Sequence, residues 1–332
     1  MSCTSPLWYL QLRSDSRKGK VYRFLEKPSP VFDQQTGEVF EPIQIPCGQC
    51  RSCRIHKSRE WANRCVMEAT QYDEGKCWFV TLTYDDEHLP QGDVMRATLN
   101  PDDVTKFFHD LRQYYQRQYS WQGIRYFYAG EYGDLNDRPH YHVLLFNCPI
   151  QDLNFYKISY NSDTYWTSPI FDKIWGKGYV VIGEMNWNSA AYTARYTLKK
   201  LNGDLGKEYY STQGVIPEFC RMSNRPGIGA GFLEKHKDKI YLNDEIILPS
   251  PSYGKSLIVK PPKYFDRKMK ESADDQDIIK IIKTTDARKR VAEMGAESDR
   301  NILGYNDVER FQFLDEICKR KFSTFSRGNI NE

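Results

Sequence analysis

The hydrophobic and polar positions along the chain predict several short β-strands separated by helices. An uninterrupted run of aromatic and β-branched residues at 77–84 predicts a buried central strand. Further strands are expected at 124–129, 139–146 and 178–183. Because only a short polar loop separates the second and third of these four runs, we expect those two strands to pair as antiparallel neighbours.

Helical segments lie between and before these strands. Residues 55–70 and residues 189–200 both have helical composition. Asn100 can cap a third helix, which has Pro101 at its first position and extends to about Arg117. The chain therefore mixes helices and strands along much of its length.

The order of these elements predicts an α+β fold. Strands and helices alternate too few times for repeated parallel crossovers, so we expect a central antiparallel sheet with helices packed on one face. Residues 1–70 are expected to form an irregular N-terminal extension with a cysteine cluster and a basic helix. Residues 71–240 would form the central domain, and residues 241–332 a linker and a charged helical tail.

Length, charge and cysteine content narrow the functional classes. The 332 residues can bury a sizeable core, and the formal charge of +3 does not by itself indicate nucleic-acid binding. No apolar run approaches the roughly 20 residues that span a bilayer, which argues against a membrane protein. Nine cysteines without a secretory leader indicate reduced thiols and a location inside the cell.

Two histidines stand one residue apart in the strand expected at 139–146. Because successive side chains of a strand point to opposite faces, His140 and His142 project from the same face. Two imidazoles in this arrangement can bind one metal ion, although many such pairs are only structural. The pair gains weight from other residues rather than from its own spacing.

A pair of tyrosines lies in the helix expected at 189–200. Tyr192 and Tyr196 are four residues apart, so both phenols would share one helical face. Asn188 or Ser189 can cap this helix, and Gly203 is expected to end it. Tyrosines at this spacing usually pack in a core, but together with a metal-binding histidine pair they indicate phosphoryl transfer through a phosphotyrosine.

Cysteines cluster just before the first predicted helix. Cys47, Cys50 and Cys53 could hold a structural zinc ion with a fourth ligand, for which Cys65 or His56 is available. Reduced thiols without a metal are the alternative explanation.

Aromatic side chains alternate with lysines between residues 154 and 187. This composition suits single-stranded DNA, because bases stack on aromatic rings while basic groups follow the phosphates. Packing in an ordinary core explains most of these rings as well.

Three motifs resemble those of rolling-circle replication initiators of the His-hydrophobe-His endonuclease superfamily. They are Thr81-Leu82-Thr83, His140-Tyr141-His142, and Tyr192 with Tyr196. Other segments are similar to the replication initiators of the gokushovirus branch of the Microviridae, which are small single-stranded DNA phages. These segments are 47–54, 58–62, 130–133, 138–142, 174–178 and 189–196, within about residues 45–240.

The resemblance implies a ferredoxin-like (RRM-like) core and a metal-dependent endonuclease that cuts single-stranded DNA with a tyrosine nucleophile. His140 and His142 would bind Mg²⁺ or Mn²⁺ together with Glu131, for which Asp134 and Asp137 are competitors. The cation would act as a Lewis acid on the scissile phosphate.

Tyr192 and Tyr196 would be the nucleophiles, and Lys199 would activate one of them, because a free tyrosine is a poor nucleophile at neutral pH. The family usually has a lysine after the first tyrosine. This chain has Arg195 instead, which stays charged and cannot easily lose a proton. The residues expected to contact DNA are Arg138, Arg195 and Lys200.

By the same resemblance, the protein would nick single-stranded DNA at a supercoiled replication origin, form a 5′-phosphotyrosyl link, and later rejoin the strand. A host DNA polymerase and helicase would be its partners, in the cytoplasm of a bacterial host cell. A relaxase or a single-strand transposase of the same superfamily is an alternative. A zinc-stabilised nucleic-acid-binding protein without catalysis is another.

Overall fold

The computed structural model divides the chain into two compact units. One unit comprises Met1–Lys57 and Ala292–Asn331, and the larger unit comprises Ser58–Val291. The residues that the structure describes are 3–12, 21–26, 29–32, 37, 39–94, 96–133, 136–160, 162–199, 203–249, 256–272, 283–288, 290–291, 293–294, 297–298, 301, 304 and 307–326.

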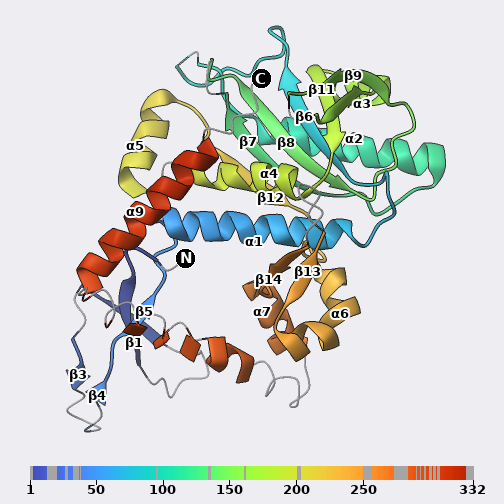
Figure 1. The fold of residues 1–332 in the computed structure, drawn as a ribbon. Coiled ribbons are helices and arrows are strands. Elements are labelled where there is room, and N and C mark those ends of the chain that lie inside the picture. The colour runs from blue at the N-terminus through green and yellow to red at the C-terminus, as the bar shows by residue number, and fades with distance from the viewer. Residues whose placement is uncertain are drawn as a thin grey trace. The chain divides into compact units, whose positions relative to one another are not determined.

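The larger unit is built on a seven-stranded antiparallel sheet (Figure 1). Its strands are β6 (Trp78–Tyr84), β7 (Arg125–Tyr132), β8 (Pro139–Phe146), β9 (Asn154–Ile158), β10 (Thr164–Thr167), β11 (Gly178–Glu184) and β12 (Phe219–Met222). They follow the order β12-β7-β8-β6-β11-β10-β9. The central antiparallel sheet of an α+β fold, expected from the sequence, is therefore confirmed.

The hydrophobic pattern located the inner strands correctly. The four predicted strands are present as β7, β8, β6 and β11, and β7 pairs with β8 in the expected antiparallel sense. All eight residues of β8 are buried. A strand buried on both faces needs a nearly continuous apolar run, which is the pattern that its sequence has.

Four helices cover the two faces of this sheet: α1 (Arg51–Ala69), α2 (Pro101–Tyr119), α3 (Pro169–Trp175) and α4 (Trp187–Lys199). Alternate residues of β8 divide between two hydrophobic clusters. Val143 packs in one cluster with residues of α2 and α3. Leu144 packs in the other with residues of α4 and of the second half of α1. The expectation of helices on one face is therefore wrong, because both faces of the central strands are apolar.

The start of α2 follows the sequence prediction. The Asn100 side chain accepts a hydrogen bond from the backbone N–H of Asp102 at 3.1 Å, and Pro101 occupies the first turn. The helix ends at Tyr119, slightly later than predicted, where Ser120 adopts a left-handed conformation with φ of 52°.

The start of α4 differs from the prediction. The Ser189 backbone N–H donates to Oδ1 of Asn186, and the Asn186 N–H donates to Oγ of Ser189, both at 2.9 Å. This reciprocal pair is a capping box, so the cap is Asn186 rather than Asn188 or Ser189. Gly203, which was expected to end this helix, instead begins α5 (Gly203–Gln213).

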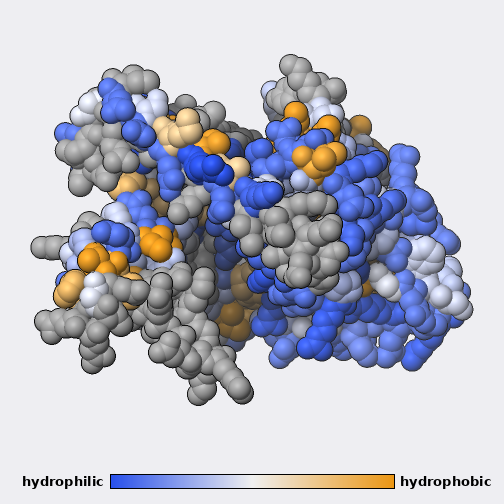
Figure 2. Space-filling model, turned by 90° about the horizontal axis from the view of Figure 1, so that it is seen from below, coloured by the Kyte–Doolittle hydropathy of each residue, from blue (hydrophilic) through white to orange (hydrophobic). Residues whose placement is uncertain are grey.

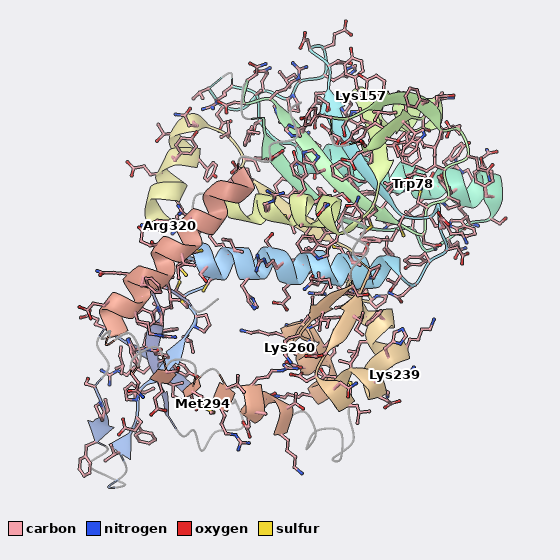
Figure 3. The ribbon with its side chains drawn as sticks, in the orientation of Figure 1. Trp78, Lys157, Lys239, Lys260, Met294 and Arg320 are labelled. Carbon is pink, nitrogen blue, oxygen red and sulfur yellow. The ribbon has the colours of Figure 1, made fainter. Side chains whose placement is uncertain are left out.

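Further elements of the larger unit follow the sheet: α6 (Ala230–Asn243), β13 (Ile246–Leu248), β14 (Leu257–Val259) and α7 (Lys263–Ser272). Residues of α6, β13 and α7 share a hydrophobic cluster with α1 and α4. Lys260, labelled in Figure 3, follows β14 and pairs with Asp244 at 3.4 Å. A stretch that the sequence assigned to a linker from residue 241 thus contains packed elements.

The smaller unit contains a three-stranded sheet of β1 (Leu7–Leu12), β2 (Val21–Leu25) and β5 (Ile43–Ile45). It also contains the paired strands β3 (Val31–Phe32) and β4 (Val39–Phe40), the first turns of α1, and α9 (Asp307–Ser326). The N-terminal segment is therefore not wholly irregular. The unit ends at Lys57, inside α1, whereas the sequence suggested a boundary near residue 70.

Hydrophilic residues prevail on the face of the protein shown in Figure 2, and hydrophobic residues form small separate groups there. None of the helices in the described part of the chain could cross a membrane, because none is long and apolar enough. At one edge of the large sheet, all five residues of β9 are exposed, including Lys157 (Figure 3).

Candidate active site

The pairing of β7, β8 and β6 brings the predicted metal ligands together. Glu131 of β7 lies directly opposite His140 of β8. Thr81 of β6 lies opposite His142. Directly paired residues point to the same face of a sheet, so these side chains converge on the face that α4 covers.

Both imidazoles contact one carboxylate oxygen. Nε2 of His140 lies 2.7 Å from Oε1 of Glu131, and Nε2 of His142 lies 3.0 Å from the same oxygen. All three residues are buried, with 8%, 5% and 2% of the surface of His140, His142 and Glu131 exposed. A sequence separation of nine residues is thus closed by the β7–β8 hairpin.

The opposite nitrogen of each imidazole is also held. Nδ1 of His140 donates to the backbone carbonyl of Arg138 at 3.0 Å. Nδ1 of His142 lies 3.2 Å from the Thr81 hydroxyl. Such contacts fix the orientation of a histidine ring and direct its Nε2 toward a metal ion. Thr81 therefore has a positioning role that the sequence analysis quoted only as part of a motif.

The electrostatics of Glu131 fit a carboxylate beside cationic groups. Burial raises its pKa, but hydrogen bonds and charge interactions with His140 and His142 outweigh that effect and lower the pKa to about 2. The carboxylate is therefore ionised at neutral pH despite its burial.

These three residues fit the coordination chemistry of a divalent cation. Glu131, His140 and His142 each offer one ligand atom, and these atoms lie within 4.8 Å of one another. Two imidazole nitrogens and one carboxylate oxygen form a mixed set that leaves coordination positions for a substrate. Asp137, a competitor in the sequence, instead forms an ion pair with Arg96, and Asp134 lies outside the described residues.

Tyr192 lies against this group. Its ring packs edge-on against His142, with a centroid distance of 5.0 Å, and against Phe79 at 6.1 Å. The guanidinium carbon of Arg195 lies 5.8 Å from the centre of the Tyr192 ring. One predicted nucleophile and one predicted DNA-binding cation are thus beside the histidine pair.

Small and hydrogen-bonded residues bring α4 close to the sheet. Ala190 and Ala194 are completely buried, and their short side chains allow a close approach of the helix. The indole N–H of Trp187 donates to Oδ1 of Asn63 in α1 at 2.9 Å. Tyr192 lies between the two alanines along the helix and therefore faces the same side of the molecule as His142.

The remaining predicted residues of this helix are only partly described. The backbone of Tyr196 and Lys199 belongs to α4, but their side chains lie outside the described part of the structure, as does Lys200. Because Tyr196 follows Tyr192 by one helical turn, the backbone places both on the same side of α4. The roles of Tyr196, Lys199 and Lys200 stay predictions.

Arg138 has partners within the protein. Its guanidinium donates to the backbone carbonyl of Tyr84 at 2.8 and 3.2 Å and pairs with Asp86 at 2.7 Å. These contacts attach the loop before β8 to the end of β6. Binding of DNA by Arg138 stays a prediction.

The cysteine cluster has a different fourth member from the one expected. The group that the structure brings together comprises Cys3, Cys47, Cys50 and Cys53, and includes neither Cys65 nor His56. Cys65 lies 12 residues after Cys53 in α1, about 18 Å along the helix axis, and is fully buried in the hydrophobic core. Cys65 as a fourth ligand is therefore wrong. Cys3 is the only other cysteine in the first 57 residues, a signal that the sequence offered.

Comparisons with known proteins agree with this site. A family model described as replication-associated protein ORF2 matches residues 77–201, which include β6, the Glu131–His140–His142 group and α4. The chain is 39% identical over 279 residues to the replication-associated protein ORF2 of Spiroplasma virus 4. That alignment covers 83% of this chain and 84% of the viral protein.

Two further relatives are also phage proteins. The replication-associated protein VP4 of Bdellovibrio phage phiMH2K is 29% identical, over 84% of this chain and 87% of that protein. The replication-associated protein ORF4 of Chlamydia phage 1 is 31% identical, over 57% of this chain and 48% of that protein. No solved structure matches the chain. The extent and identity of the first alignment show that the chain belongs to the family of phage replication-associated proteins that includes ORF2 of Spiroplasma virus 4.

Proposed function

We propose that this protein initiates rolling-circle DNA replication by nicking the origin strand through a tyrosine nucleophile. The observation that carries the proposal is the convergence of both histidine Nε2 atoms on Oε1 of Glu131, with the Tyr192 ring 5.0 Å from that of His142. Membership in a family of replication-associated proteins supports the same function.

In this proposal, Glu131, His140 and His142 hold Mg²⁺ or Mn²⁺. The mixed nitrogen and oxygen donors favour Mn²⁺ somewhat over Mg²⁺. When bound, the cation supplies Lewis-acid stabilisation of charge on the scissile phosphate. Thr81 and the Arg138 carbonyl keep the two rings oriented, so the ligand nitrogens do not have to reorganise.

Tyr192 acts as a nucleophile on the phosphorus atom. A bond forms between its phenolic oxygen and phosphorus, and the bond from phosphorus to the 3′-oxygen breaks. The phenolic proton passes to a base, and the 3′-oxygen leaves as a hydroxyl after it gains a proton. The phosphotyrosyl bond conserves the energy of the broken link, so cleavage and rejoining need no ATP.

Tyr196 is proposed as the second nucleophile, which cuts the regenerated origin and releases a closed circle. Lys199 would activate Tyr196, because it follows on the same helix. Arg195 stays charged and would bind phosphate rather than exchange a proton. The two tyrosines would thus have different acid–base partners, a departure from the usual pattern of the family.

The partners follow from the product of the first cut. A free 3′-hydroxyl primes a host DNA polymerase, and a helicase separates the strands ahead of it. Because the site acts on single strands, supercoiling of the origin must expose its substrate. The proposed location is the cytoplasm of the bacterial host cell.

The direct test is covalent capture of DNA. We would incubate the protein with labelled single-stranded DNA from the origin region and Mn²⁺, and resolve the products on denaturing gels. Wild type, Tyr192→Phe and Tyr196→Phe are expected to give a covalent protein–DNA band, and the double variant none. Tyr156→Phe, at an exposed position in β9, is the matched control and should keep the band.

A band that persists in the double variant would contradict the tyrosine mechanism. Cleavage that persists after His140→Ala with His142→Ala would contradict the metal-dependent one. If every variant binds DNA tightly and none cuts any segment of the phage genome, the protein is a zinc-stabilised nucleic-acid-binding protein instead. That second candidate is favoured by one observation, the group of four cysteines. A relaxase or transposase would pass the covalent test but recognise a different DNA site.

A further inference from the structure

Four cysteines of the smaller unit meet at the start of α1, in a group that the proposed nicking reaction does not use. Their sulfur atoms all lie within 4.8 Å of one another. Sγ of Cys3 lies 3.6 Å from Sγ of Cys47 and 3.7 Å from Sγ of Cys50. All four thiols are half-buried, and none forms a disulfide.

The spacing of the sulfur atoms fits a tetrahedral metal site. Zinc–thiolate bonds are about 2.3 Å long, so four sulfurs at the corners of a tetrahedron lie about 3.8 Å apart. A disulfide needs sulfurs about 2 Å apart. The observed distances of 3.6 and 3.7 Å therefore match a shared metal ion rather than two disulfides.

Backbone amides point at the sulfurs, as is needed to stabilise thiolates. The N–H groups of Gln49 and Cys50 donate to Sγ of Cys47 at 3.4 and 3.1 Å. The N–H of Cys47 donates to Sγ of Cys3 at 3.3 Å. Gly48 makes this turn with φ of +73°, a conformation that favours glycine. Hydrogen bonds to ionised sulfur are stronger than those to a neutral thiol.

The surroundings favour negative charge. The group lies at the N-terminal end of α1, where the helix dipole is positive, and the first turn of α1 contains Arg51 and Arg54 but no acidic residue. Burial raises the pKa of Cys50, yet hydrogen bonds from Thr4 and from backbone amides lower it to about 6. A thiolate is therefore available there at neutral pH.

The smaller unit also has little hydrophobic core. Its buried hydrophobic side chains, among those that the structure describes, are Leu10, Ile55 and Cys318. Units with so little apolar burial usually depend on a metal ion or disulfides for stability. Four reduced thiols in one place supply the ligands for such an ion.

We propose that Cys3, Cys47, Cys50 and Cys53 bind one structural Zn²⁺ ion, which joins the segment before β1 to the start of α1. Four thiolates fill the coordination sphere, so this site has no open position for a substrate. It is distinct in chemistry from the Glu131–His140–His142 group, because thiolates select zinc and mixed imidazole–carboxylate sets accept Mg²⁺ or Mn²⁺.

The test measures metal content and ligand number in the full-length protein. Elemental analysis of the purified protein is expected to find one zinc ion per chain. After exchange to Co²⁺, the thiolate-to-cobalt absorption reports how many sulfurs bind. Cys3→Ser should lower this absorption to that of three thiolates and weaken zinc binding. Cys65→Ala and Cys77→Ser are the control variants and should leave both measurements unchanged.

The His140→Ala, His142→Ala double variant separates this proposal from the nicking function. It should lose cleavage and keep its zinc ion, whereas Cys3→Ser should lose sulfur coordination whether or not the protein cuts DNA. Iron in place of zinc, four free thiols in the wild-type protein, or loss of a thiolate in Cys65→Ala rather than in Cys3→Ser would each overturn the proposal.

Discussion

At the scale of single residues, the candidate active site depends on contacts behind the metal ligands as much as on the ligands. His140 and His142 each use Nε2 toward Glu131, and each is held at Nδ1 by an oxygen atom. The oxygen behind His140 belongs to the backbone, so no side-chain substitution removes it. The oxygen behind His142 belongs to Thr81, which makes that contact testable.

Removal of the Thr81 hydroxyl should weaken metal binding. Thr81→Val keeps the volume of the side chain but loses the contact with Nδ1 of His142 at 3.2 Å. Loss of such a contact typically lowers metal affinity or activity by about 10- to 100-fold. We expect the Mn²⁺ concentration for half-maximal cleavage to rise accordingly, with the same rise in the Mn²⁺ dissociation constant measured by calorimetry.

Thr81→Ser is the matched variant, because it retains the hydroxyl and should restore most of the affinity. If Thr81→Val binds Mn²⁺ as well as wild type, the ring of His142 is held by packing against Phe79 instead. The two rings are stacked at a centroid distance of 5.5 Å.

The depressed pKa of Glu131 predicts a pH dependence of stability in the metal-free protein. Its pKa is about 2 when folded, against 4.5 for an unperturbed glutamate. A lowered folded-state pKa stabilises the protein above the unfolded pKa, and this stabilisation is lost as the pH falls from 4.5 toward 2. The full effect is about 3 kcal/mol. Urea unfolding between about pH 6 and pH 3 measures it.

Glu131→Gln is the comparison for this titration. It should unfold with a smaller change in free energy over the same pH interval, because the titrating carboxyl is gone. Equal slopes for the two proteins would show that other acids dominate the acid response.

At the scale of elements, the sheet is the scaffold that aligns the site, and its close contacts limit what the sequence can contain. β11 starts at Gly178, where φ is +142° and a Cβ atom would lie 2.3 Å from the Thr83 carbonyl oxygen. The backbone of β6 therefore approaches β11 at a point where no other residue fits.

Gly178→Ala should destabilise the larger unit by about 2–4 kcal/mol, because the backbone of β6 or β11 must move to accept the methyl group. Gly75→Ala is the control, since Gly75 has φ of +75° but no atom within 4 Å of a Cβ. That variant should cost only about 1 kcal/mol for its left-handed conformation. Similar losses in both variants, measured by urea unfolding, would contradict the close-contact explanation.

The same strands extend the site face toward the exposed edge of the sheet. Tyr179 of β11 lies opposite Thr83 of β6, which lies opposite His140, so the three share one face. Tyr179 is 68% exposed, which leaves its ring accessible to a base. Given the proposed function, we expect this ring to stack on single-stranded DNA.

Tyr179→Ala should weaken binding of single-stranded DNA by about 1–3 kcal/mol, the usual contribution of one stacked base. Tyr119→Ala is the control, because Tyr119 is exposed on α2, which packs on the opposite face. Fluorescence anisotropy at fixed salt measures both affinities. Equal affinities for the two variants would place the DNA elsewhere on the protein.

At the scale of the whole molecule, segments distant in the sequence form each unit. The smaller unit combines the first 57 residues with residues 292–331, and the larger unit contains all seven strands of the main sheet. Sequence patterns detect local elements well, but they do not reveal which separated segments pack together. The predicted boundaries near residues 70 and 240 consequently differ from those in the structure.

The sequence by itself determined the inner strands, the cap of α2, and the residue types of the site, because periodicity and capping are local properties of the chain. It also indicated the family through short motifs. Only the tertiary structure decided that helices cover both faces of the sheet, that Thr81 supports His142, and that Cys3 rather than Cys65 completes the cysteine group. These features depend on strand register and on contacts between residues that are 44 or more positions apart, which no local pattern encodes.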